Sequence, residues 1–147
     1  MSSLMKHTHT YKNIKRDKEF CINFLNQNFT ENCWKSIKEH KYDNNEITSA
    51  GFTAEDAISI KAPRIKESFL KMECEYQWEK ELIPNSHNIT ICGKVKHICV
   101  NESFAKAITK DKYGKESFMF NLHNPINPFN GEHLGGGVGT INYNFGM

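Results

Sequence analysis

The sequence predicts a mainly β protein, an antiparallel sheet with the proportions of a small barrel, accompanied by short helices. The strongest observation is a pair of long strand-like segments, residues 68–78 and 88–100, separated by a Pro-Asn-Ser turn. Two long strands joined by a short turn are typical of a hairpin. The helical segments are short and do not alternate regularly with strands, which favours an antiparallel arrangement over a parallel α/β sheet.

The length and composition predict one globular domain, residues 1–147. A chain of 147 residues with 38% hydrophobic residues can bury a core without disulfide or metal staples. No apolar run approaches the roughly 18 residues of a membrane helix, and the first ten residues lack the apolar region of a secretory signal. Five cysteines without C-x-x-C spacing favour free thiols in a reducing compartment, so we expect a cytoplasmic protein.

The charge pattern disfavours nucleic acid as a partner. The net charge is +2, and only Arg16 and Arg64 among the 19 basic residues are arginines. Arginine is the usual bidentate reader of phosphates and guanine edges, so its scarcity argues against a nucleic-acid interface.

The first quarter of the chain predicts a strand, a helix and a second strand. Residues 2–5 form a short strand, and Thr10 caps a helix that turns Tyr11 and Ile14 inward and ends near residues 17–18. Residues 19–25 are almost continuously apolar, which predicts a strand buried on both faces.

The middle of the chain predicts two short helical segments and an extended approach to Pro63. Thr30 caps the first helix, and Trp34 and Ile37 face inward from it. The second lies within residues 44–52 and ends at Gly51, a plausible C-cap. Residue 62 precedes a proline, which disfavours helix there.

Polar and apolar residues alternate along the hairpin strands, so each strand has a polar and an apolar side. In residues 68–78 the charged residues, among them Lys71 and Glu73, alternate with apolar ones and are expected to face water. Gly93 marks a bend or bulge in the partner strand. Beyond the hairpin we expect a helix over residues 104–110 capped by Ser103, a strand over 118–122 and a loop-like tail over 124–147.

Residues 6–11, Lys-His-Thr-His-Thr-Tyr, are the best candidate binding segment. They stand at the entry to a helix, where backbone N–H groups and the positive end of the dipole can hold an anion. The same residues also fit a simple helix cap in a solvated turn. The glycine run at residues 135–139 lacks the context of a phosphate loop and predicts a turn. The seven histidines show no metal-ligand spacing, so we expect no metal site.

Several phrases, taken in order, resemble the flavin reductase-like family of FMN-binding split barrels, flavoredoxins included. None is specific alone, but their order over roughly residues 3–100, and more weakly beyond, is fairly specific. The phrases are Thr8–Ile14 (THTYKNI), Glu19–Asn23 (EFCIN), Ala50–Thr53 (AGFT), Ala62–Ser68 (APRIKES) with Met72–Glu75 (MECE), Ile91–Val95 (ICGKV) and His133–Gly137 (HLGGG).

The resemblance implies a split barrel, a homodimer with FMN near the subunit interface, and hydride transfer from NAD(P)H through the flavin. By position Thr10 would bind the FMN phosphate, with the remaining site residues around it. Thr8 and Tyr11 would lie beside the phosphate, Lys6 would neutralise its charge, and Ser2 and Ser3 would lie along the flavin edge. The resemblance points to no catalytic side chain.

One departure from the family lies at the start of the chain. In the family two or more strands precede the phosphate turn and include a Ser/Asn-rich segment at the flavin ring, whereas residues 1–5 here resemble the end of a later strand. We therefore expect a barrel without its first strands, with the exposed edge covered by dimerisation or by residues 124–147. The alternative is a non-catalytic barrel that dimerises or binds a partner without flavin.

Overall fold

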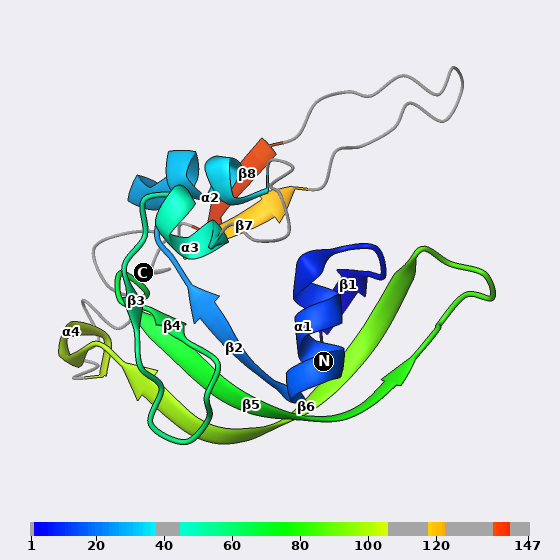
Figure 1. Cartoon of the computed structure of the whole chain (residues 1–147). Coiled ribbons are helices and arrows are strands. Elements are labelled where there is room, and N and C mark those ends of the chain that lie inside the picture. Colours follow the sequence, from blue (N-terminus) through cyan, green and yellow to red (C-terminus); the bar gives the residue numbers. More distant parts are fainter. Residues whose placement is uncertain (1, 38–44, 106–117, 123–136, 142–147) are drawn as a thin grey trace, which may run out of the picture.

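The computed structural model describes residues 2–37, 45–105, 118–122 and 137–141 (Figure 1). The fold is built on a long antiparallel hairpin, β5 (Leu70–Lys80) and β6 (Asn88–Val100). The short strands β1 (Ser2–Met5) and β2 (Glu19–Phe24) pair with its outer sides, so the sheet order is β1-β6-β5-β2 with every pair antiparallel. The predicted mainly antiparallel fold with short helices is confirmed.

Helix α1 (His9–Asp17) lies within the curve of the hairpin and carries the first core (Figure 1). Ile14 is buried against Ile89 and Ile91 of β6, as its place on the inner helix face predicted. The helix begins earlier than expected, because the hydroxyl of Thr8, not Thr10, accepts the N–H of Tyr11. It ends as predicted, at Asp17.

A second core lies beyond the end of β2, where short helices pack beside a two-stranded ribbon (Figure 1). Leu25, Ala50 and Phe52 are buried there, and Met119 of the ribbon packs against them. The elements are η1 (Gln27–Phe29), α2 (Thr30–Ser36), α3 (Glu46–Ser49), β7 (Phe118–Leu122) and β8 (Gly137–Ile141).

The predicted ends of the helices around the second core are partly right. Gly51 ends α3 with φ 82°, and its N–H donates to the carbonyl of Thr48, as a glycine C-cap should. Thr30 does not cap α2; it is the first helical residue, and its hydroxyl donates to the carbonyl of Gln27. Ile37 lies past the end of α2 and is 63% exposed, so it is not part of the inner stripe.

The elements predicted after residue 100 agree with the structure only in part. The helix expected over 104–110 appears as α4 (Glu102–Ala105), which includes Ser103 instead of following it, and residues 106–110 lie outside the described residues. Strand β7 confirms the strand expected over 118–122. Strand β8 contradicts the loop-like tail at residues 137–141, since it pairs with β7 along its whole length.

The strand β2 is less buried than its apolar sequence predicted. Its residues are half-buried from Glu19 to Asn23, and Phe24 is 38% exposed. The reason is its position, because β2 is an edge strand of the described sheet and has a neighbour on one side only.

Two register shifts in the hairpin decide which side chains face α1. One lies between Tyr76 and Trp78, where Gln77 has no partner across the ladder. Trp78 therefore pairs with Cys92 and is 46% exposed, while Glu79 pairs with Ile91 and faces the helix. The alternation over residues 68–78 placed Trp78 on the apolar side of the strand, and this was wrong because of the register shift.

The second register shift lies between Glu73 and Cys74, and near it the predicted exposure of two charged side chains is wrong. Lys71 and Glu73 were expected to face water, but they are 8% and 0% exposed. The side of the sheet opposite α1 is covered there by residues 54–65, which carry the two-stranded ribbon β3 (Ala54–Glu55) and β4 (Arg64–Ile65). The expected extended segment before Pro63 is thus part of a lid over charged side chains.

Gly93 tests the close packing at the bend of the hairpin. A Cβ atom at this position would lie 2.5 Å from the Phe20 ring and 3.1 Å from Cys74 Cβ. Gly93→Ala should therefore lower the free energy of unfolding by about 1–3 kcal/mol, as overpacking does, measured by urea denaturation. Adding Phe20→Leu should recover part of that loss. An alanine variant as stable as the parent would contradict the packing described here.

Candidate functional site

A cavity of about 650 Å³ opens beside the first residues of β2. One face of α1 forms a wall of it, because Thr10, Asn13 and Asp17 are spaced three and four residues apart and so line up along the helix. The remaining walls are the start of β2 and residues 61–63. The lining residues are Thr10, Asn13, Ile14, Arg16, Asp17, Glu19, Phe20, Cys21, Lys61, Ala62 and Pro63.

The cavity combines charged groups with an apolar wall. The Arg16 guanidinium donates two hydrogen bonds of 2.7 Å to Asp17 and thereby lowers the pKa of that carboxyl, to which the charge of Lys61 contributes. The N–H of Lys61 donates to Glu19 Oε2 at 2.7 Å. Phe20 and Pro63 add apolar surface. The cavity thus offers hydroxyl, amide, guanidinium and ammonium donors, with the carboxylates of Asp17 and Glu19, beside apolar surface, a mixture typical of small-molecule sites.

Of the six residues predicted to bind the ligand, Thr10 lines this cavity. Thr8 lies at the N-terminal end of α1, where its hydroxyl caps the helix and donates to the carbonyl of Met5 at 2.8 Å. Ser2 and Ser3 lie on β1, paired with Ile91 and Thr90 of β6.

Lys6 and Tyr11 contact the far half of the hairpin. Lys6 forms an ion pair with Glu81, and the Tyr11 hydroxyl donates to Glu79 Oε1 at 3.0 Å. Lys15 Nζ also contacts Glu79 Oε1, at 2.8 Å. Burial raises the pKa of Tyr11, and its hydrogen bond to Glu79 raises it further. These contacts hold α1 against the hairpin, on a side of the helix different from the one that carries Thr10.

Three further cavity-lining side chains can donate to an anion and were not predicted from the sequence: Asn13, Arg16 and Lys61. The spacing of Asn13 from Thr10, at three residues, was a usable signal for a shared helix face, whereas Arg16 is six residues from Thr10, a spacing that does not indicate a shared face. Lys61 had no such signal, because the fold brings it to α1 from 45 residues further along the chain.

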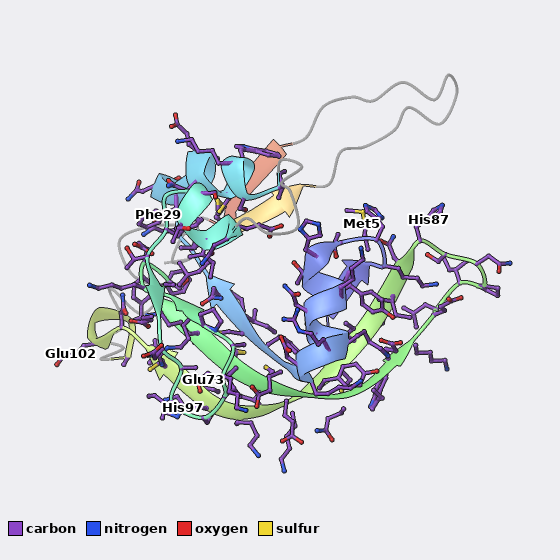
Figure 2. The ribbon with its side chains drawn as sticks, viewed as in Figure 1. Met5, Phe29, Glu73, His87, His97 and Glu102 are labelled. Atoms are coloured by element: carbon purple, nitrogen blue, oxygen red, sulfur yellow. The ribbon has the colours of Figure 1, made fainter. Side chains whose placement is uncertain are left out.

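Behind the cavity wall lies a buried charged cluster centred on Glu73. Its carboxylate accepts hydrogen bonds from the N–H of Ile58 (3.0 Å), from the N–H and hydroxyl of Ser59 (both 2.7 Å) and from Arg64 Nη1 (3.0 Å). Arg64 also pairs with Glu55, which pairs with Lys71. Figure 2 shows Glu73 close to His97, its partner across the ladder, where residues 54–65 cross the sheet.

The hydrogen bonds to Glu73 outweigh the cost of its burial. Burial alone raises the pKa of a carboxyl group, but the bonds from Ile58, Ser59 and Arg64 stabilise the charged form and lower the pKa of Glu73 to about 2. Alternation in the strand could not reveal this role, since it says which residues share a side but not which side another segment covers.

The pH dependence of stability should report this carboxylate. Its pKa is lower in the folded state, about 2, than the ordinary 4.5, so its stabilisation is complete above pH 4.5 and is lost as the pH falls toward 2. The loss should be on the order of 3 kcal/mol, at about 1.4 kcal/mol per pKa unit. We expect Glu73→Gln to lack this part of the acid slope of the unfolding free energy, measured by urea denaturation from pH 6 to pH 2. Glu75→Gln on the same strand should keep it, and an unaltered slope in Glu73→Gln would contradict the assignment.

The described part of the chain carries neither a disulfide nor a cluster of metal-ligating side chains. All five cysteines are free thiols, and burial raises the pKa of Cys21 to about 11. Among the described residues, no three His, Cys, Asp or Glu side chains gather as metal ligands would, and no helix is long and apolar enough to cross a membrane.

The chain resembles known proteins both in sequence and in fold. A family model described as Flavin reductase like domain matches residues 1–115. A relative from Aquifex aeolicus (strain VF5) is 36% identical over 66 residues, which are 45% of this chain and 34% of that protein.

Solved structures show the same architecture. A protein with a split barrel domain from Shewanella frigidimarina NCIMB 400 is 25% identical, with a TM-score of 0.63 over 68% of this chain and 50% of its own. Flavoredoxin of Desulfovibrio vulgaris (Miyazaki F) is 16% identical, with a TM-score of 0.68 over 98% of this chain and 70% of its own. These neighbours confirm the split-barrel fold class. The chain spans half the length of the Shewanella protein and about a third of the Aquifex relative.

Proposed function

The chain belongs to the flavin reductase like domain family, and from this membership we propose that it is a cytoplasmic flavoprotein that binds FMN and transfers hydride from NAD(P)H through it. Flavoredoxin and the NADH:FAD oxidoreductase SgcE6 of Streptomyces globisporus are among its structural neighbours, which supports a flavin as the cofactor. The choice of FMN rests on the family resemblance.

The observation that carries this proposal is the cavity wall formed by α1. Thr10 lies in the first turn of the helix, where the positive end of the helix dipole attracts an anion, while the N–H of Tyr11 is already bonded to the Thr8 hydroxyl. Its hydroxyl, the Asn13 amide and the Arg16 guanidinium line one cavity, so all three can donate to a phosphate held there. A volume of about 650 Å³ falls within the usual range for small-molecule sites.

The flavin, when bound, would supply the redox chemistry, and the chain would bind and orient it. Thr8 would act indirectly, by starting the helix that presents Thr10. Tyr11 would hold that helix against the hairpin through Glu79, and Lys6, at the same end of α1, would add positive charge. Ser2 and Ser3 would lie along the flavin edge from β1.

We further propose that the chain works as a homodimer. The face of the sheet that carries α1 bears two rows of paired apolar side chains, Phe24–Leu70–Val100 and Ile22–Met72–Ile98. Ile98 and Val100 are 54% and 45% exposed. A second copy that covers these rows would remove apolar surface from water.

Flavin binding can be tested directly with the whole chain. Purified protein should bind added FMN, and excess FMN should raise its melting temperature, since a ligand that binds only the native state stabilises it. Thr10→Ala should weaken FMN binding by about 1.5–3 kcal/mol, the range for a hydrogen bond to a charged group, measured by quenching of flavin fluorescence.

Thr48→Ala, an exposed threonine outside the cavity, is the matched control and should bind FMN as the parent does. If FMN changes neither the melting temperature nor the fluorescence, the flavoprotein proposal fails. The non-catalytic alternative, a barrel that dimerises or binds a partner without flavin, would then stand.

Dimer formation should depend on the exposed apolar rows. Ile98→Lys places a charge at the most exposed position of these rows and should shift the chain from dimer to monomer in sedimentation velocity at micromolar concentration, with an unchanged far-UV spectrum. Gln77→Lys, exposed at the register shift, should leave the dimer intact. A parent chain that sediments as a monomer would refute the homodimer.

A further inference from the structure

The wall of the cavity opposite α1 has no role in the function proposed so far. We propose that Lys61 on this wall is a second phosphate-binding residue, and that Glu73 is the positioning residue that holds the segment bearing it. The inference rests on the proposed function, because it assigns the cavity to the phosphate end of a flavin.

Lys61 is placed to face the helix across the cavity. It lines the same cavity as Thr10 and Arg16, and its charge contributes to lowering the pKa of Asp17 on α1. Its backbone is fixed at the entrance by the hydrogen bond of its N–H to Glu19 Oε2. An ammonium group brought from a different segment would give a phosphate donors from two sides.

Apolar packing does not account for the position of Ile58 and Ser59, the residues that lead to Lys61. The side chain of Ile58 is 65% exposed, and Ser59 is exposed as well. The N–H groups of these two residues instead reach the carboxylate of Glu73, which has no exposed surface. At Ile58 and Ser59 the segment is therefore held by polar contacts to one buried group, and at Lys61 by the hydrogen bond to Glu19.

Glu73 holds both ends of the same loop. Ile58 and Ser59 donate to it from one end, and Arg64 Nη1 donates from the other at 3.0 Å. Residues 60–63 span the interval, and residues 61–63 among them form the cavity wall. A single carboxylate thus clamps the base of the loop whose tip carries the ammonium group.

Neutralising Glu73 should loosen this clamp without removing any group from the cavity. A glutamine amide offers one acceptor oxygen and an NH₂ group, which cannot accept from the donors that face it. The loop would then hold Lys61 less firmly, and a ligand would lose the contact to its phosphate. Contacts to the rest of the ligand, made by α1 and β2, would remain.

The test compares FMN with riboflavin, which lacks the phosphate, on the full chain. Lys61→Met should weaken FMN binding about 5- to 20-fold, as loss of a charged donor does, and leave riboflavin binding unchanged. Glu73→Gln should act in the same way. The double variant should bind FMN no more weakly than the weaker single variant, because the two residues act through one contact.

The controls separate positioning from folding. Ser59→Ala removes one of the hydrogen bonds to Glu73, so it is a milder variant that can be used if Glu73→Gln does not fold. It should lower FMN affinity about 2- to 5-fold and leave riboflavin affinity unchanged. Glu75 is half-exposed and forms an ion pair with Lys96. Glu75→Gln should change the affinity for neither flavin. All affinities are measured by fluorescence at a temperature where circular dichroism shows the variant folded.

Three results would overturn the inference. If Lys61→Met leaves FMN affinity unchanged, Lys61 does not bind the phosphate. If Ser59→Ala and Glu73→Gln weaken FMN and riboflavin equally, Glu73 has only a structural role. If Thr10→Ala weakens FMN while all the Glu73 and Lys61 variants bind normally, the proposed function stands without this second wall. A parent chain that binds neither flavin removes both proposals.

Discussion

A carboxylate without solvent exposure must find hydrogen-bond donors within the protein, and this constraint organises the half of the sheet opposite α1. Glu73 lies in the middle of the long strand β5 and is fully buried. Leaving a buried charge unpaired costs several kcal/mol. Its donors come from residues 58–64, so the path of that segment follows from the burial of one side chain. The cavity wall at residues 61–63 lies between these contacts, and the ladder of β3 and β4 joins the same segment to residues 54–55.

The register shift in the hairpin decides which side chains of β5 face α1 and which face away from it. Where Gln77 has no partner, Glu79 turns toward α1 and Trp78 turns away from it. Glu79 then accepts hydrogen bonds from Tyr11 and Lys15, which hold the helix in place. Without the shift, the strand would present its charged and apolar residues to the wrong sides.

The candidate flavin site lies where these two arrangements meet. The helix supplies Thr10 and Asn13, the edge strand β2 supplies Phe20, and the clamped loop supplies Lys61. Binding sites in which rigid elements hold the donors in advance lose less entropy when a ligand binds. Such preorganisation is what a flavin reductase like domain needs if the cofactor carries the chemistry and the protein orients it.

By itself the sequence determined the strands, the hairpin, the residue at which α1 ends and the glycine cap at Gly51. These features depend on neighbours within a few residues, which period and turn chemistry report directly. The ordered phrases also identified the family. Only the tertiary structure decided that Glu73 is buried, that Thr8 caps α1 in place of Thr10 and that Lys61 joins the cavity. Alternation states which residues share a side of a strand, but a distant segment decides which side is covered, and an unpaired residue in the ladder can exchange the two.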